Sequence, residues 1–343
     1  MNLGEEEVGP DEQRYFERIA TIIADEQKRR YAKDVKPMHR DAHAKHHGVV
    51  RAEFIVDADL PPELRVGIFA EPRTFDAYIR FSNGEGRLKS DKKADARGMA
   101  IKLLGVLGEK LLDEERDATT QDFLMITHHT FFVRTLPDYI SLVENATRGT
   151  PLRHFFGWNP FAWRLREVRH VKQALKVIAN PLTTQYWSTV PFAFGKGLAA
   201  KWSARPQASQ DAANAEPRGD SYLRDAMAQT LRERDVSFDF MVQLQTDAER
   251  MPIEDSTIEW DESVSPYRKV ATIRIPKQEF DREEQHVLAE NLSFTPWHSI
   301  PEHRPLGNMN RTRKHVYETI SKLRHAHNGV PRKEPDGSEI PKP

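Results

Sequence analysis

The spacing of apolar residues predicts a chain that begins with a helix and continues with strands. Between residues 11 and 33, Ile19, Ile22 and Ile23 fall on one side of a helix. From residue 49 onward, short apolar or alternating runs are separated by Gly, Pro, Asn and Asp, which is typical of strands joined by turns. The predicted strands are 49–56, 64–69, 77–82, 99–104, 123–127, 238–245 and 268–275.

The second half of the chain mixes helical and irregular patterns. Residues 151–203 combine aromatic side chains with Pro and Gly, which predicts helices joined by irregular loops, and the polar segment 204–220 is expected to be a mobile loop. Further helices are expected over 137–146 and 281–288. Early strands followed by later helices place the chain in the α+β class.

The same patterns suggest how the chain is divided. Its last residues, from 331 to 343, are charged and rich in Pro, which is typical of disorder. We expect an N-terminal helical arm over 1–36, a main domain over 37–328 and a disordered tail over 329–343.

Composition narrows the classes of function. The chain has 343 residues, of which 38% are hydrophobic and 30% charged, so it can bury a sizeable core. Its formal net charge of −1 gives no reason to expect nucleic-acid or membrane partners. It contains no cysteine, which excludes disulfides, thiolate metal ligands and cysteine nucleophiles. The N-terminus lacks the apolar stretch of a signal peptide and no run is long enough to span a membrane, so we expect a cytoplasmic protein.

A short run near the C-terminus carries the first candidate chemistry. Arg313 and Tyr317 are four residues apart, which places both side chains on one face of a helix. The guanidinium is always charged and can hold the phenol oxygen as phenolate. A phenolate is a hard ligand for ferric iron, and Tyr is one of the known protein ligands of haem. On its own the pair is a weak signal, because many solvated basic helices carry a half-buried Tyr.

A second cluster lies far away in the sequence. His43 is the type of residue that most often serves as general acid and base near neutral pH, and Ser82 could hydrogen-bond its ring and set the tautomer. Arg40, Arg80 and Arg324 could bind carboxylates as planar forks. The two clusters together offer one iron ligand, one acid–base residue and arginines for two propionates.

At these residues the chain resembles the haem-dependent catalase superfamily. That family carries its distal histidine in a segment like Arg-x-x-His-Ala-Lys, followed by a strand like Val-Arg-Phe-Ser, a segment like Asp-x-Arg-Gly-x-Ala-x-Lys, a Phe-Phe pair and a later Arg-x-x-x-Tyr. The order and spacing agree from about residue 37 to residue 327. The matching segments here are 40–45, 77–82, 95–102, 131–132 and 313–324.

The resemblance implies a fold, a cofactor and residue roles. The fold would be an antiparallel β-barrel with surrounding helices, and the cofactor haem b. Tyr317 would be the axial iron ligand beside Arg313, and His43 the distal acid–base residue. The remaining implied haem contacts are Arg40, Arg80, Ser82, Phe132, Tyr139 and Arg324.

The chain also departs from the family on the distal side. Catalases carry an Asn four or five residues before the Phe-Phe pair, and here those positions hold Ile126 and Thr127. The Thr127 hydroxyl could donate one hydrogen bond to a peroxide, which makes it the second catalytic candidate. His128 and His129 follow, and the sequence leaves open whether either enters the pocket.

These departures favour a small catalase-related enzyme that reduces or rearranges hydrogen peroxide or larger, organic hydroperoxides, fatty-acid hydroperoxides included. Its partners would be a peroxide and a small reductant, and it could form a dimer or a larger homo-oligomer. The alternative is a non-catalytic protein that binds or senses haem. A third hypothesis is a barrel without haem that uses a histidine-rich metal site, for which His43, His46 and His47 have suitable spacing.

Overall fold

The computed structural model describes residues 2–156, 163–207 and 219–340. In this part of the chain, nine antiparallel strands form one sheet in the order β5-β4-β3-β2-β1-β9-β8-β7-β6. The sheet closes into a barrel because β5 pairs with both β4 and β7. The strands are β1 (His46–Val56), β2 (Thr74–Asn83), β3 (Arg97–Leu104), β4 (Thr120–Ile126), β5 (Tyr186–Trp187), β6 (Phe192–Ala193), β7 (Ala199–Pro206), β8 (Val236–Leu244) and β9 (Arg268–Ile275).

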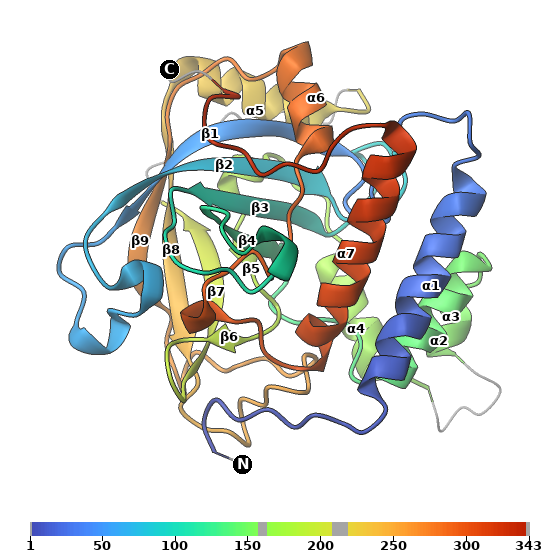
Figure 1. Cartoon of the computed structure of the whole chain (residues 1–343), viewed down its shortest axis with the longest axis horizontal. Helices are drawn as coiled ribbons and strands as arrows, with labels where there is room; N and C mark the ends of the chain where they lie inside the picture. Colours follow the sequence, from blue (N-terminus) through green and yellow to red (C-terminus); the bar gives the residue numbers. More distant parts are fainter. Residues whose placement is uncertain (1, 157–162, 208–218, 341–343) are drawn as a thin grey trace.

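Helices cover two sides of the barrel (Figure 1). Helices α5 and α6 pack against β1, while α1 packs against α2 and α7 at the side where β2 ends and β3 begins. The helices are α1 (Glu12–Arg30), α2 (Leu136–Thr147), α3 (Leu152–Phe155), α4 (Leu165–Ala174), α5 (Tyr222–Glu233), α6 (Glu283–Asn291) and α7 (Asn308–Asn328). No helix in the described ranges is long and apolar enough to cross a membrane.

The barrel interior is filled by aromatic side chains. Phe240 lies at the centre, with ring centroids 4.9 Å from Phe123 and 5.0 Å from Phe54. Trp202 crosses Phe123 edge-on at 5.6 Å. Because successive side chains of a strand point to opposite faces, the alternate residues of β2, β3 and β4 project outward, toward the helices.

Most of the expected strands are present, but the segment 64–69 is not a strand. It forms two short 3-10 helices, Pro62–Leu64 and Gly67–Phe69. Gly67 has a positive φ of 56°, and a Cβ there would lie 2.4 Å from Nε2 of His303. A short apolar run is buried in either conformation, so its pattern could not separate the two.

The structure also corrects the reading of the aromatic segment 151–203. It contains α3 and α4 as expected, but also β5, β6 and the start of β7. Strands of two residues are too short to show a period. The loop expected over 204–220 begins inside β7, and residues 208–218 lie outside the described ranges.

The segment expected to be a disordered tail lies against the barrel as far as Ile340. Tyr78 donates a hydrogen bond from its hydroxyl to Glu339, at 3.1 Å, and Arg51 donates to the carbonyl of Gly337, at 3.1 Å. Its polar composition concealed this order, because the tail is held mainly by charged and polar partners on the barrel.

Candidate active site

His43 lies just before β1 and is held by contacts from β2 and β3. Its backbone N–H donates to the carbonyl of Gly84 at 3.0 Å, and its φ of 58° is one that few residues other than glycine adopt. Nδ1 lies 3.0 Å from the Ser82 hydroxyl. A Cβ at Gly98 would come within 2.5 Å of Nδ1, so the imidazole occupies the space that this glycine leaves.

The surroundings of His43 favour its neutral form. Burial is the largest cause, and the positive charges of Arg80 and Arg313 add to it, so that the pKa falls to about 4. At neutral pH the imidazole is therefore able to accept a proton. Helix α7 therefore contributes to the electrostatic environment of the histidine through Arg313.

The register of the sheet places four residues in one row on the outer face of the barrel. Ser82 pairs with Gly98, Gly98 with Ile126, and Ile126 with Trp187. Residues directly opposite each other on antiparallel strands point to the same face. Ile126 and Trp187 therefore face the same side of the sheet as the hydroxyl that holds His43.

This outer face is incompletely packed. Ala100, Leu124 and Ile126 lie on the outer face of β3 and β4, each of which has a neighbouring strand on both sides. All three side chains are nevertheless only half-buried. Helix α7 runs beside this end of β2 and β3 (Figure 1). An apolar strip of the barrel therefore remains accessible on the side where α7 lies.

Helix α7 carries the paired arginine and tyrosine. Arg313 donates a hydrogen bond to the Tyr317 hydroxyl at 3.2 Å, and its guanidinium lies 5.3 Å from the centre of the ring. A second hydrogen bond, to the side chain of Asn310, orients the guanidinium at 3.2 Å. Tyr317 is half-buried and packs in a cluster with Ile19 and Tyr139, so helices α1 and α2 support it.

The three arginines expected to bind propionates gather near the ends of α6 and α7. Arg80 donates to the carbonyl of Ala289 at 3.1 Å and to the carbonyl of His43 at 3.0 Å. Arg40 and Arg324 both donate to the carbonyl of Leu292. Backbone carbonyls thus hold all three guanidinium groups in place.

Glu290 is a member of this arginine cluster that the sequence did not reveal. Its carboxylate lies 3.8 Å from Arg40 and 4.0 Å from Arg80, and 3.1 Å from His39. Burial acts to raise the pKa of Glu290, but the hydrogen bond from His39 and the nearby arginines lower it well below its usual value. Glu290 lies just beyond the helix predicted over 281–288, and a single Glu there gives no signal that it faces two arginines.

Comparison with known proteins identifies the architecture. No family model matches the chain. A catalase-related peroxidase from Mycolicibacterium paratuberculosis is 29% identical over 184 residues, which cover 50% of this chain and 55% of that relative. A fungal catalase superposes with a TM-score of 0.62 at 16% identity, covering 83% of this chain and 59% of the catalase. Catalase A from Saccharomyces cerevisiae gives a TM-score of 0.62 at 15% identity, covering 86% and 63%.

The chain has the catalase fold. This confirms the predicted antiparallel barrel with surrounding helices and agrees with the resemblance found in the motifs. The chain spans about half the length of the curated relative it matches, because the aligned region covers 55% of that protein.

Three features of this catalase fold fit haem b. Tyr317 offers a phenol oxygen that Arg313 can hold as phenolate. The Glu290 carboxylate faces Arg40 and Arg80, Arg324 donates to the Glu290 backbone carbonyl, and Nη1 of Arg40 is buried without a hydrogen-bond partner. Two propionates would satisfy this excess of positive charge. The half-buried apolar strip on β3 and β4 suits a flat apolar macrocycle.

The structure separates the two residues that replace the distal asparagine. The Thr127 hydroxyl accepts the backbone N–H of Arg97 at 3.0 Å, and its side chain is buried beyond the end of β4. Ile126, by contrast, lies in the row of Ser82 and Gly98. Of the two residues, it is thus the apolar one that faces the same side of the sheet as Ser82, which holds His43.

The aromatic residues assigned to the pocket lie together at the start of α2. Phe131 stacks on Phe132 with centroids 4.5 Å apart and meets Tyr139 edge-on at 6.1 Å. All three are half-buried. Burial, together with the nearby Asp41 and Tyr317, raises the pKa of Tyr139, so its phenol stays neutral.

The other histidines form separate groups. His46 and His47 face Glu290 at 3.4 Å and Asp91 at 3.7 Å, and among the described residues they do not converge with His43 as metal ligands would. Thr130 bridges His128 and His170 with contacts of 3.1 Å to each. His129 pairs with Glu259 at 3.0 Å.

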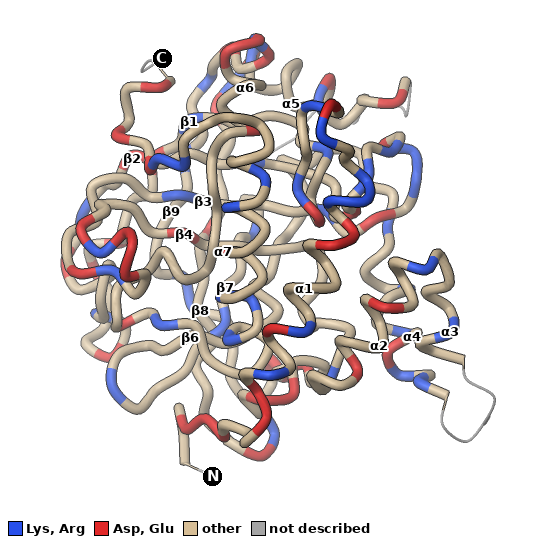
Figure 2. The backbone as a smooth tube through the Cα atoms, turned by 45° about the vertical axis from the view of Figure 1, so that its right-hand side comes forward, with Lys and Arg blue, Asp and Glu red and all other residues tan. Residues whose placement is uncertain are grey.

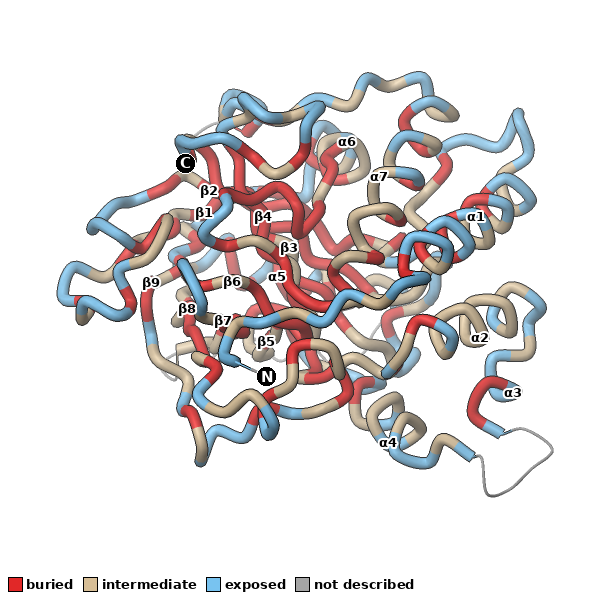
Figure 3. Tube along the Cα trace, turned by 60° about the horizontal axis from the view of Figure 1, so that its bottom comes forward, coloured by how far each residue is buried: buried red, intermediate tan, exposed pale blue. Residues whose placement is uncertain are grey.

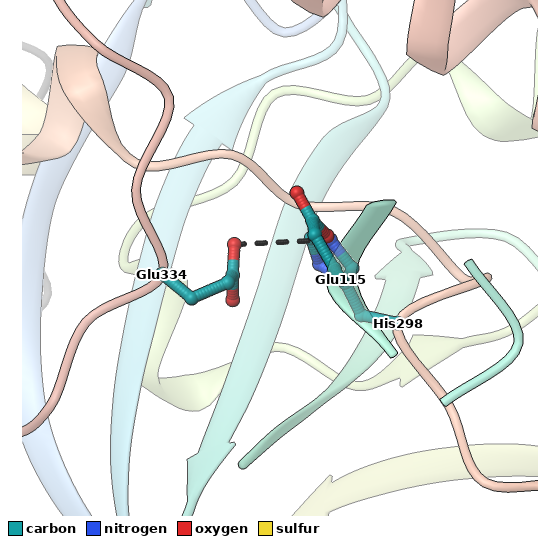
Figure 4. A group of neighbouring side chains, drawn as sticks. All are labelled: Glu115, His298 and Glu334. Carbon is teal, nitrogen blue, oxygen red and sulfur yellow. Dashed lines mark hydrogen bonds and ion pairs between the residues drawn. The ribbon is translucent and has the colours of Figure 1, made fainter. Parts of the chain in front are cut away.

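A buried charge network anchors the tail on the outer face of β3 and β4 (Figure 4). Nε2 of His298 pairs with Glu115 and lies 3.7 Å from Glu334. Its Nδ1 atom lies 2.8 Å from Asp122, and Lys102 contacts Glu334 at 2.5 Å. Burial and Lys102 act to lower the pKa of His298, but the carboxylates of Asp122 and Glu334 outweigh them and raise it to about 9.

The charges in this network balance without a metal ion. Lys102, Arg332 and protonated His298 supply three positive charges against the three carboxylates. Although two Glu and one His can hold a metal, a lysine ammonium already occupies one of the carboxylates. We therefore interpret the group as an ion-pair network that fixes the tail.

Proposed function

We propose that the chain is a haem b-dependent peroxidase of the catalase-related type that acts on peroxides and draws electrons from a small reductant. The observation that carries the proposal is the Arg313–Tyr317 pair on α7, a helix that runs beside the end of β2 where Ser82 holds His43. These residues come from opposite ends of the sequence, and the half-buried apolar strip lies on the same face of the barrel as Ser82. The named activity of the curated relative supports the same proposal.

The residues divide the task of holding the cofactor. Tyr317 would bind the iron, and Arg313 would stabilise the phenolate and disfavour its protonation. Arg40, Arg80 and Arg324 would hold the propionates. When bound, haem supplies a ferric iron that can exchange electrons with a peroxide.

His43 would move the proton that makes peroxide cleavage easier. Its neutral imidazole accepts the proton of the incoming hydroperoxide and returns it to the departing oxygen, which leaves as water or alcohol. The contact between Nδ1 and Ser82 fixes the ring while the other nitrogen is available for the transfer. The aromatic pair Phe131 and Phe132 would exclude water from this side.

The apolar side chain of Ile126 favours an organic hydroperoxide over hydrogen peroxide. A carboxamide at this position could hydrogen-bond both oxygens of a small peroxide, whereas Ile126 offers only apolar contact. An alkyl or fatty-acid hydroperoxide would gain from that contact. The position of Thr127 points the same way, because its side chain is buried beyond the end of β4 and is not in the row of Ser82 and Gly98.

The same observation supports a second candidate function. With Thr127 buried beyond the end of β4 and Ile126 in the row, the two positions that replace the distal Asn place no side-chain donor in the row of Ser82 and Gly98. A protein that binds haem without turning over peroxide would show this pattern. The test must therefore separate binding from turnover.

The test combines an absorption spectrum with a peroxide assay. Protein expressed with added haemin is expected to show the ferric spectrum of phenolate ligation, and Tyr317→Phe is expected to change it. His43→Ala is expected to keep the haem and to lose reduction of tert-butyl hydroperoxide by on the order of 100-fold or more.

A matched variant controls for general damage. Tyr15→Phe alters a tyrosine outside the site and is expected to retain spectrum and rate. A protein that takes up no haem would refute the proposal. Normal haem uptake without hydroperoxide turnover in the wild type would leave the haem-binding alternative.

A further inference from the structure

Helices α3 and α4 form a face that stands away from the barrel and carries unusual residues on its surface. Four large apolar side chains are exposed there: Leu152, Phe156, Trp163 and Leu165. The exposed fractions are 69% for Leu152 and 61% for Leu165, which are high for leucine in a folded protein. Figure 3 shows the exposed stretches of α3 and α4 beside the partly buried α2.

These side chains belong to one continuous surface, which we call the α3–α4 face. Phe156 and Trp163 meet edge-on with centroids 5.4 Å apart, so the end of α3 and the residues before α4 are joined. The backbone N–H of Arg164 donates to the carbonyl of Phe155 at 3.1 Å, which fixes this junction. Leu152 lies one helical turn from Phe156, and Leu165 begins α4.

The same face is strongly basic. Residues 148–156 and 163–177 contain seven Lys or Arg and a single acidic residue, Glu167, whereas the whole chain has a net charge of −1. Figure 2 shows Lys and Arg segments on α3 and α4. The seven basic residues are Arg148, Arg153, Arg164, Arg166, Arg169, Lys172 and Lys176.

Part of this charge has no partner within the described chain. Arg164 pairs with Asp138 and Arg166 lies 3.7 Å from Asp255, but within the described ranges Arg153, Arg169 and Lys172 form no ion pair. Arg169 and Lys172 follow Leu165 at positions i+4 and i+7 of α4, and all three are exposed on one side of the helix.

The positive charge of the α3–α4 face distinguishes between the partners that could bind there. A second copy of the chain in a symmetric dimer would place this face against itself, and the unpaired cations would repel. An occupant with negative charge is favoured instead. Exposed Leu, Phe and Trp interleaved with Arg and Lys are the residue types that settle into the headgroup region of a bilayer.

We propose that the α3–α4 face docks on a membrane surface that carries anionic phospholipids. The leucines and aromatic rings enter the headgroup region, and Arg153, Arg169 and Lys172 contact the phosphates. This differs from the expectation drawn from the net charge, because a balanced total conceals a local excess. The inference concerns where the protein acts and does not depend on the proposed peroxidase activity.

The test is co-sedimentation of the full-length protein with lipid vesicles. Vesicles of phosphatidylcholine containing phosphatidylglycerol are expected to carry the protein down, and vesicles of phosphatidylcholine alone are not. The variant Arg153→Glu/Arg169→Glu/Lys172→Glu is expected to bind on the order of 100-fold more weakly. The variant Leu152→Glu/Leu165→Glu is expected to lose about tenfold or more.

Leu107→Glu is the matched control, because Leu107 is equally exposed but lies outside the α3–α4 face. It is expected to bind like the wild type, and thermal melting of all variants checks their folding. Absence of binding to anionic vesicles, or binding that survives both sets of substitutions, would overturn the proposal. Binding to the soluble polyanion heparin would also overturn the proposal if it were as tight as vesicle binding and unchanged in the Leu152→Glu/Leu165→Glu variant. That result would indicate an acidic macromolecule as the partner. A wild-type dimer that the leucine variant converts to monomer would assign the face to self-association instead.

Discussion

The imidazole of His43 fills the space that a side chain at Gly98 would need: a Cβ added to the glycine would lie 2.5 Å from Nδ1 of the ring. It would also lie 2.8 Å from the Ser82 hydroxyl that contacts the same nitrogen. The position of the ring over the barrel therefore depends on a residue without a side chain. This makes Gly98 a sensitive place to displace the histidine without removing it.

Gly98→Ala is expected to lower hydroperoxide turnover by on the order of 100-fold, because the imidazole must leave its contact with Ser82. Haem content, measured by absorption, should stay near that of the wild type, since the residues on α7 are untouched. Gly9→Ala is a suitable control, because the nearest atom to its added Cβ is 3.5 Å away. Wild-type turnover in the Gly98 variant would show that the contact with Ser82 does not matter.

Ile126→Asn is expected to shift the preference of the enzyme toward hydrogen peroxide. The carboxamide would stand in the row of Ser82 and Gly98, where it can donate a hydrogen bond to a small peroxide. The ratio of kcat/KM for hydrogen peroxide to that for tert-butyl hydroperoxide should rise by about tenfold or more. Thr127→Val, which removes only the bond to Arg97, should leave this ratio unchanged.

The activity should remain high at acidic pH. Burial, Arg80 and Arg313 lower the pKa of His43 to about 4, so the neutral base is present above that pH and is lost as the pH falls through it. We expect kcat/KM to be level between about pH 5 and 7 and to fall below about pH 4.5. A fall centred near 6.5, the ordinary value for histidine, would contradict this environment.

The buried network of the tail predicts a loss of stability in alkali. The pKa of His298 is raised to about 9, so its contribution is complete below the ordinary value of 6.5 and is lost as the pH rises through 9. The free energy of unfolding should fall by on the order of 3 kcal/mol between pH 6.5 and 9.5 as measured with urea. His298→Gln should flatten this dependence, whereas His286→Gln, which affects a half-exposed histidine, should not.

Glu290→Gln should destabilise the haem-free protein more than the haem-loaded one. Without Glu290 the buried Arg40 and Arg80 lose their nearest carboxylate, which costs on the order of 3 kcal/mol. Propionates would restore a negative partner, so melting of the loaded protein should change less. Equal losses in both forms would argue against propionates at these arginines, and Glu63→Gln at the surface serves as the control.

The barrel could be predicted from sequence because its evidence is repeated. The strands over 49–56, 77–82 and 99–104 are short apolar or alternating runs, and their turns carry Gly, Asn or Asp. The short strands β5 and β6 could not be seen, since two residues show no period, and β5 also depends on β4, a partner far along the chain. The closure of the ring is thus a tertiary effect.

The candidate site, too, could be predicted from the sequence only in part. His43, Ser82 and the Arg313–Tyr317 pair were visible as residue types at set spacings. The choice between Ile126 and Thr127 was not, because a shift of one residue reverses the face of a strand. Glu290 and the anchored tail were hidden because a charged residue is ordinary at a surface, and only the fold shows which ones are buried.

Lys102 and Glu334 are joined across 232 residues of sequence, and this separation has a consequence for synthesis. At typical rates of elongation, Lys102 leaves the ribosome roughly 10 to 50 seconds before its partner exists. Until then, Asp122 is the carboxylate that can pair with Lys102, whose side chain is completely buried in the finished protein. The outer face of β3 and β4 can therefore reach its final packing only after translation has passed Glu334. Until then, this surface of the nascent chain must stay hydrated or be covered by another protein.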